Sequence, residues 1–248
     1  MTKNFLVVGA TSGIGLETSK LLAQNGNRVV LVSRNKEKLE SVKNSLNTSS
    51  ESHLSYSFDA TQTNLAEKFI NEVESQIQID GFVYCVGNGD SRRLKDLSYD
   101  VLLPIMNSNF FTFMEMVRVL IKNRKNKENQ FNIVAVSSLA STHANPKYYS
   151  AYTASKSALE GAIRVLAPEL ALKNCAITSV KPGYVDTPRI TADMLIHPDL
   201  EKHLKQSGFQ PCGIIKPETV AQFIMFLLDR KDMSFSGANI PINSGAVS

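Results

Sequence analysis

Two side chains on one predicted helix have the types and the spacing needed for proton transfer. Tyr152 and Lys156 lie four residues apart in the stretch YTASK, so a helix places them on the same face. A phenol has a pKa near ~10 and is a poor acid–base group at neutral pH, but an ammonium group beside it lowers that pKa. The pair is therefore a candidate general acid–base group, the alternative being a surface pair without a role. Neither Tyr148 nor Tyr149 has a lysine four residues on.

A second candidate site lies near the start of the chain, in VVGATSGIGLE (7–17). Gly9, Gly13 and Gly15 follow an apolar run and precede a predicted helix. A helix that begins at such a loop points unpaired N–H groups at whatever occupies it, which suits a phosphate. The spacing G-x-x-x-G-x-G departs from the common dinucleotide fingerprint, so a nucleotide site and a plain strand-to-helix turn both stay open at this point.

Apolar runs of strand length alternate with helix-length segments, and these elements must position the candidate residues. Predicted strands cover 4–10, 28–34, 53–60, 81–87, 131–138, 175–183 and 237–243. Predicted helices cover 13–26, 36–47, 65–78, 98–123, 152–174 and 217–229. Pro104 is expected to kink or break its helix, and Pro168 to bend its own.

This alternation predicts an α/β fold, a doubly wound parallel sheet of about seven strands with helices on both faces. No linker, repeat or low-complexity tract divides 1–248, so one domain is expected. Ligands of such sheets bind beyond the carboxyl ends of the strands. The glycine loop and the ends of the second and fifth strands meet at that edge.

The composition of the chain argues against a nucleic-acid-binding protein and against a membrane-spanning one. The 248 residues are 43% hydrophobic and carry a formal net charge of +4, which is typical of a soluble globular protein. The densest basic stretches, Arg92-Arg93 and 122–130, have no interleaved aromatics, so no nucleic-acid partner is expected. No apolar run reaches ~20 residues, so no membrane span is expected.

Cysteine and histidine usage points to the cytoplasm and away from metal binding. Cys85, Cys175 and Cys212 have no paired spacing, which favours free thiols in a reducing compartment. The histidines lack ligand spacing, so no metal site is expected.

Seven short motifs, in order along the chain, resemble those of the short-chain dehydrogenase/reductase family. They are GATSGIG (9–15), Asp59-Ala60, YCVG (84–87), Asn109, Ser138, Tyr152-x-x-x-Lys156 and PGYVDT (182–187). The terminal strand followed by NSGA is similar to the end of the family's fold. The resemblance covers nearly the whole chain and implies a Rossmann-type fold and NAD(P)-dependent interconversion of alcohols and carbonyls.

The resemblance implies a role for each catalytic candidate. Tyr152 would exchange the proton, and Lys156 would also hydrogen-bond the nicotinamide ribose. Ser138 would hydrogen-bond the substrate oxygen, with Ser137 as its rival. Asn109 would support a water relay to the lysine, with Asn107 two residues away and a purely structural asparagine as alternatives.

The cofactor expected is NADP(H) rather than NAD(H). The second strand ends in Ser33 and Arg34 with no acidic residue, and an arginine there accommodates the 2′-phosphate of NADP; otherwise Arg34 merely caps the strand. The expected cofactor-binding residues are Gly9, Thr11, Ser12, Gly13, Ile14, Gly15, Ser33, Arg34, Asp59, Ala60, Val86, Gly87, Tyr152, Lys156, Pro182, Gly183, Val185 and Thr187.

Some positions depart from the family pattern. Tyr84, Cys85 and Val86 replace the first three residues of N-N-A-G, which puts local sheet bonding in doubt rather than hydride transfer. A segment at about 189–216 would form a substrate lid with apolar surface. The expectation is an NADPH-dependent reductase of ketones or aldehydes that forms a homodimer or homotetramer; the alternative is a regulator that senses NADP without turnover.

Overall fold

The fold is that of a computed structural model, which describes residues 2–46, 53–89, 91–125, 127–142, 148–188, 190 and 198–246. The described residues form a parallel sheet of seven strands in the order β3-β2-β1-β4-β5-β6-β7. The strands are β1 (Asn4–Val8), β2 (Arg28–Ser33), β3 (Leu54–Ser57), β4 (Gly81–Tyr84), β5 (Phe131–Val136), β6 (Cys175–Pro182) and β7 (Asn239–Ile242). The predicted doubly wound parallel sheet is confirmed.

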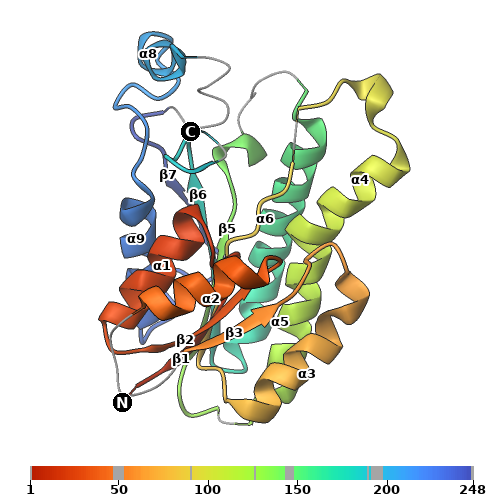
Figure 1. The fold of residues 1–248 in the computed structure, drawn as a ribbon, viewed down its shortest axis with the longest axis vertical. Coiled ribbons are helices and arrows are strands. Elements are labelled where there is room, and N and C mark those ends of the chain that lie inside the picture. The colour runs from red at the N-terminus through yellow and green to blue at the C-terminus, as the bar shows by residue number, and fades with distance from the viewer. Residues whose placement is uncertain are drawn as a thin grey trace.

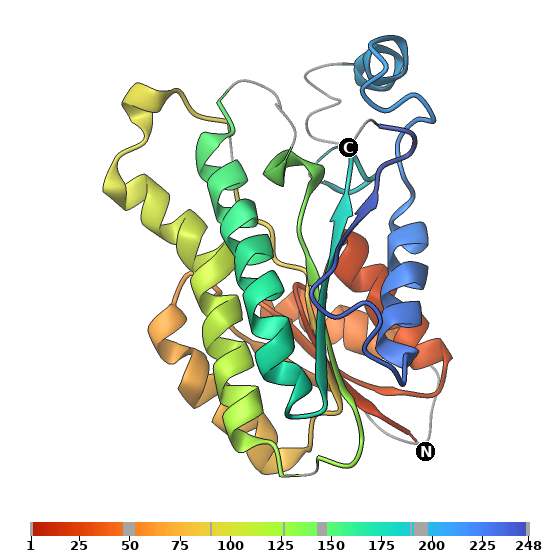
Figure 2. The ribbon, with the colours of Figure 1, turned by 180° about the vertical axis from the view of Figure 1, so that it is seen from behind.

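Helices cover both faces of this sheet (Figures 1 and 2). One face carries α1 (Gly13–Gln24), α2 (Lys36–Ser45) and α9 (Pro217–Asp229), and the other carries α3 (Ala66–Gln76), α4 (Tyr99–Met106), α5 (Thr112–Asn123) and α6 (Ser150–Ala171). Each side has its own buried apolar core. Because both faces of the central strands are buried, these strands are mostly apolar, and β5 and β6 bury a few polar side chains among them.

Shorter elements lie between the main ones. Three 3₁₀ turns are η1 (Thr63–Leu65), η2 (Leu94–Asp96) and η4 (Leu139–Ser141), and α8 (Leu200–Gln206) lies beyond the carboxyl edge of the sheet, at the top of Figure 1. Within the described segments, no helix combines the length and apolarity needed to cross a bilayer.

The chain reverses its winding direction beside β1. From β1 it proceeds outward to β2 and β3, then returns to pair β4 with the other edge of β1. A ligand site forms where the loops after neighbouring strands diverge in this way. The loops after β1, β2, β4, β5 and β6 therefore all open onto one edge.

The helix predicted over 98–123 contains an irregular turn, and helical structure continues on both sides of it. Pro104 lies inside α4, and the chain passes through a π-helical turn, η3 (Asn107–Phe111), before continuing as α5. The Ser108 hydroxyl donates to the carbonyl oxygen of Pro104 at 2.8 Å. Such π turns insert one extra residue into a helix and often occur at functional sites.

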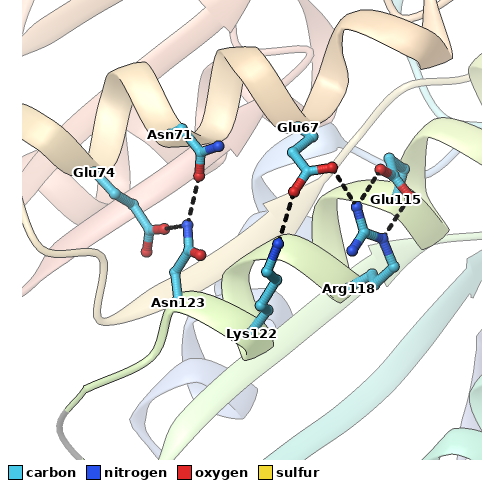
Figure 3. Close-up of polar contacts among 7 residues, drawn as sticks. All are labelled: Glu67, Asn71, Glu74, Glu115, Arg118, Lys122 and Asn123. Atoms are coloured by element: carbon cyan, nitrogen blue, oxygen red, sulfur yellow. Dashed lines mark hydrogen bonds and ion pairs between the residues drawn. The ribbon is translucent and has the colours of Figure 1, made fainter.

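Polar side chains join α3 to α5 along their exposed seam (Figure 3). The Glu67 carboxylate pairs with Arg118 at 2.7 Å and with Lys122 at 3.0 Å. The Asn123 amide donates to Asn71 and to Glu74, both at 2.8 Å. The polar side chains on this side of α5 therefore find their partners on α3.

Candidate active site

A single cleft collects the predicted site residues. It has a volume of about 520 Å³ and follows the carboxyl edge of the sheet, from the end of β2 to the loop after β6. Every predicted catalytic and cofactor-binding residue lines it except Asn109, which lies just behind its wall.

The glycine loop leaves no room for side chains. Gly9 and Gly13 have φ angles of +89° and +51°, a region that other L-residues rarely adopt. A Cβ on Gly15 would lie 2.2 Å from the carbonyl oxygen of Gly9. The glycines therefore let the loop pack tightly against its own backbone, Cys85 and Thr187. This packing holds the loop at the start of α1, where helical N–H groups can bind a phosphate.

The end of β2 forms a polar, cationic corner of the cleft. The Thr11 and Ser33 hydroxyls are hydrogen-bonded at 2.8 Å. The Ser57 hydroxyl donates to the backbone carbonyl of Arg34 at 3.0 Å, which fixes the main chain while the Arg34 side chain stays exposed.

Sequence reasoning missed two residues in this corner. Asn35 caps α2 by accepting a hydrogen bond from the Lys38 amide at 2.8 Å, and both residues line the cleft. The signal was available, because asparagine is a preferred N-cap residue. The acidic residue lining the cleft, Asp59, lies elsewhere, after β3, and accepts from the Thr61 amide at 2.9 Å.

Tyr152 and Lys156 share the inner face of α6. Lys156 is 1% exposed, and its Nζ donates to the carbonyl oxygens of Val86 at 3.0 Å and Val136 at 2.8 Å. Its Nζ also lies 5.9 Å from the centroid of the Tyr152 ring. Burying an ammonium group is costly unless it is hydrogen-bonded, and the carbonyls after β4 and β5 meet that need. Tyr149 packs edge-on against the Tyr152 ring at 6.2 Å.

The two serines after β5 point in different directions. The Ser137 hydroxyl is buried and donates to Glu160 at 2.5 Å. Ser138 is half-buried, and its Oγ accepts from the Ala140 amide at 3.2 Å. Because the Ala140 amide supplies one hydrogen to the Ser138 oxygen, the hydroxyl proton of Ser138 is available to a substrate oxygen. This geometry favours Ser138 over Ser137.

The two candidate asparagines in η3 are likewise separated by the fold. The Asn107 amide donates to the Thr61 carbonyl at 2.9 Å, on the far side of the helix from α6. Asn109 is fully buried, accepts from the Asn88 amide at 2.7 Å and donates to the Ser155 hydroxyl at 2.8 Å. Asn109 therefore connects the loop after β4 to the residue beside Lys156, and the part Asn88 plays was not foreseen.

The residues that replace the family's motif after β4, Tyr84 and Cys85, make hydrogen bonds of their own. The buried Tyr84 hydroxyl donates to the Ser108 carbonyl at 2.5 Å, and the Cys85 amide donates to the Val8 carbonyl at 2.8 Å. Sheet bonding is thus intact at this point. Burial raises the pKa of the Cys85 thiol to about 12, although the Lys156 ammonium opposes this shift, so Cys85 is no ready nucleophile.

The loop after β6 closes the cleft opposite the glycine loop. The buried Gln210 side chain accepts from the Tyr184 amide at 2.8 Å and donates to the Tyr184 and Gly213 carbonyls at 3.0 and 2.7 Å. A Cβ on Gly183 would lie 2.3 Å from the Gln210 Oε1. Gln210 was not predicted, since no local pattern signals a contact made across 26 residues.

The predicted lid falls partly outside the described residues, at 189 and 191–197. Its described part contributes Ile190 and Phe209 to the cleft. The Phe209 ring meets the Tyr184 ring edge-on at 6.0 Å. Among the residues that the structure describes, no three histidine, cysteine or acidic side chains cluster as a metal site would require.

Known proteins are similar to this chain in sequence and in fold. Residues 3–194 match the family described as short chain dehydrogenase. Carbonyl reductase family member 4 of Danio rerio is 33% identical over 235 residues, which cover 92% of each chain. The 3-oxoacyl-[acyl-carrier-protein] reductase FabG of Thermotoga maritima is 30% identical over 247 residues, 98% of this chain and 96% of that protein.

Solved structures agree in fold. A 3-oxoacyl (acyl-carrier-protein) reductase from Agrobacterium tumefaciens, with NADP bound, superposes with a TM-score of 0.87 at 20% identity, covering 98% of this chain and 93% of that chain. A short chain dehydrogenase from Burkholderia cenocepacia, in complex with NADP, gives a TM-score of 0.85 at 23% identity, covering 98% and 97%.

Proposed function

Because this chain belongs to the short-chain dehydrogenase family, and is therefore an oxidoreductase acting between C=O and CH–OH groups, we propose that it is an NADPH-dependent reductase of a ketone or aldehyde. The observation that carries the proposal is the convergence of Ser138, Tyr152 and Lys156 on the cleft that the glycine loop enters.

The residues of the cleft fit a phosphorylated dinucleotide. The backbone of the Gly9–Gly15 loop and the start of α1 would hold the pyrophosphate. Ser33 and Arg34, with Lys38 beside them, would hold the 2′-phosphate, because none of the three carries a negative charge that would repel it. Asp59, Ala60, Val86 and Gly87, and Pro182, Gly183, Val185 and Thr187 farther on, would line the adenine and nicotinamide ends.

Residues of this chain would then bind and protonate the carbonyl oxygen. NADPH supplies a hydride to the carbonyl carbon when bound. Ser138 donates a hydrogen bond that polarises the carbonyl, and Tyr152 gives its phenolic proton to the developing alkoxide. The Lys156 ammonium stabilises the resulting phenolate, and Asn109 positions the neighbouring Ser155 and the loop at Asn88. In alcohol oxidation each proton movement runs in reverse.

The substrate end of the cleft is aromatic and apolar. Tyr149, Tyr184, Ile190 and Phe209 line it, so the substrate we propose has an apolar portion next to its carbonyl. The similar proteins include a carbonyl reductase and a 3-oxoacyl-[acyl-carrier-protein] reductase, so the panel of test substrates should include carbonyl compounds and 3-oxoacyl thioesters.

We further propose one domain over 1–248, a homodimer or homotetramer, and a cytoplasmic location. The described cysteines are free thiols, which suits a reducing compartment. Phe111, Val165 and Leu172 expose apolar surface on the layer that η3, α5 and α6 form, and a second copy would cover it.

Turnover of NADPH decides between the reductase and the alternative, a protein that senses NADP without catalysis. Wild type should consume NADPH with at least one member of a carbonyl panel, followed by the loss of NADPH absorbance. Tyr152→Phe removes the proton donor and should lower kcat by about 10²-fold or more. Because the ring and the other expected cofactor-binding residues remain, NADPH binding should still be detected by fluorescence. Tight NADPH binding by wild type without turnover of any carbonyl would favour the sensor.

A further inference from the structure

A buried ion pair lies behind the cleft and has no part in the reaction described above. Glu160 on α6 pairs with Lys181 on β6 at 3.2 Å, and their side chains are 3% and 9% exposed. The Lys181 ammonium also donates to the Thr142 hydroxyl at 3.0 Å. Both charges are therefore satisfied inside the protein, one element away from the candidate active site.

The glutamate of this pair holds the Ser138 loop from both sides. The Ser137 hydroxyl donates to Glu160 Oε1 at 2.5 Å. The Ser141 hydroxyl lies 2.5 Å from the same oxygen and 2.8 Å from the Ser138 carbonyl oxygen, so its one proton is shared between these two acceptors. Ser137 directly precedes Ser138, and Ser141 ends the η4 turn that follows it. Glu160 is thus bonded before and after the residue whose hydroxyl meets the substrate.

Glu160 lies on the same helix as Tyr152, the proposed proton donor. Tyr152, Lys156 and Glu160 follow one another at intervals of four on α6, so they lie along one face of the helix. The helix fixes Tyr152, and Glu160 fixes the Ser138 loop to the helix. The distance between the two groups that bind the carbonyl oxygen is therefore set through Glu160.

Stability alone does not account for this arrangement. Replacing a buried ion pair with apolar residues of similar volume is often neutral or stabilising. A chain selected only for a firm core would have little use for Glu160 and Lys181, whereas a reaction that needs two hydrogen-bonding groups in register is sensitive to shifts of about 1 Å.

We propose that Glu160, neutralised by Lys181, is a positioning residue that keeps the Ser138 hydroxyl in register with Tyr152. This inference rests on the proposed reductase function. Glu160 does not line the cleft; it acts through Ser137 and Ser141.

Two charge-free double variants separate positioning from stability. Glu160→Gln with Lys181→Met keeps an amide oxygen for Ser137 and Ser141, while Glu160→Leu with Lys181→Met keeps none. We expect kcat within about threefold of wild type for the first and lowered about tenfold or more for the second. NADPH affinity, the KM for the carbonyl and the unfolding midpoint in urea should differ little between the two.

The same exchange in a Ser138→Ala background tests whether Glu160 acts through Ser138. In that background, the kcat of the leucine variant should be less than about twofold below that of the glutamine variant, because the effects of coupled residues are not additive. If the leucine variant does not fold, Ser137→Ala decides: it removes a hydroxyl that donates to Glu160 and should lower kcat about threefold in wild type but not in the Ser138→Ala background.

The outcomes separate the two proposals. A wild type that reduces no carbonyl would overturn the proposed function and this inference with it. An active wild type whose leucine and glutamine variants have equal kcat, or whose losses add to that of Ser138→Ala, would overturn the positioning role alone.

Discussion

At the scale of single residues, Arg34 is the side chain expected to select the cofactor. It lies at the cleft with its main chain fixed by Ser57 and no acidic neighbour among Ser33, Asn35 and Lys38. An aspartate there would repel a 2′-phosphate and accept from a ribose hydroxyl.

Arg34→Asp should therefore weaken NADPH binding by about 10- to 100-fold, the loss of a charge-assisted hydrogen bond, and tighten NADH binding. Fluorescence titrations with both dinucleotides measure the effect. Arg93→Asp, at an exposed arginine away from the cleft, is the matched control for charge alone. Tighter binding of NADH than of NADPH by wild type would contradict the assignment.

The glycine loop gives a second residue-scale prediction. Gly15→Ala would drive a methyl group into the Gly9 carbonyl, so α1 must move away from the loop and NADPH binding should fall at least about tenfold. Gly26→Ala is the control, because its φ of +76° is strained but no atom lies within 4 Å of the added Cβ. It should cost about 1 kcal/mol of unfolding free energy and leave NADPH affinity unchanged; equal affinities in the two variants would refute the steric argument.

Motifs identified the candidate reacting groups, whereas the residues that support them had no signal in the sequence. Tyr152 and Lys156 were found because their spacing is local. Glu160, Gln210 and Asn88 act through contacts across 19 or more residues, and only the fold shows which partners they meet. The fold also separates Asn107 from Asn109, whose sequence surroundings are similar, by giving the two side chains different partners.

At the scale of elements, the alternation of apolar strands with helices predicted every strand of the sheet. Strand lengths were overestimated, as at β1 and β4, because the apolar runs continue into loops that line the cleft. The π turn at η3 had no signal, since it depends on where Ser108 and Asn109 find partners after the helices have packed.

His53 joins three elements and gives a pH-dependent prediction. Its Nδ1 accepts from the Val29 amide in β2 at 3.1 Å, and its Nε2 contacts the Leu46 carbonyl, at the end of α2, at 3.2 Å. Burial holds the pKa of this imidazole below its usual value of 6.5. Protonation of Nδ1 would break the bond to Val29.

Because the folded pKa of His53 is below the unfolded one, its contribution to stability is complete above pH 6.5 and is lost as the pH falls through the folded pKa. Urea unfolding from pH 7.5 down to about 5 should show this loss in wild type. His53→Gln should flatten that part of the profile, whereas His203→Gln, at an exposed histidine of α8, should retain it. Parallel profiles for all three proteins would exclude His53 as the source.

At the scale of the whole molecule, one outer layer has no covering element among the residues that the structure describes. In Figure 2, α5 and α6 lie side by side, and no other described helix lies over them. Val165 is 75% exposed, Leu172 90% and Phe111 40%, while the seam between α5 and α3 is closed by Glu67, Arg118 and Lys122. The polar seam lies between α3 and α5, whereas these exposed apolar side chains belong to η3, to α6 and to the residue that follows α6.

We expect wild type to behave in light scattering as a multiple of the 27.3 kDa chain. Val165→Glu with Leu172→Glu places charges in the proposed contact and should shift the population toward monomer at micromolar concentration, because an unpaired buried charge is costly. Leu65→Glu, at a 43% exposed leucine in η1, should leave the mass unchanged. A monomeric wild type would disprove assembly.

The surplus residue of η3 carries a consequence for how the sequence can change. A π turn holds one more residue than an α-helical turn, so the five residues 107–111 occupy about the rotation that four would take in an α-helix. Deleting one residue there should therefore leave α4 and α5 facing their present neighbours, in an unbroken helix. The loss would fall on the groups that the turn itself presents, such as the Asn109 amide between Asn88 and Ser155.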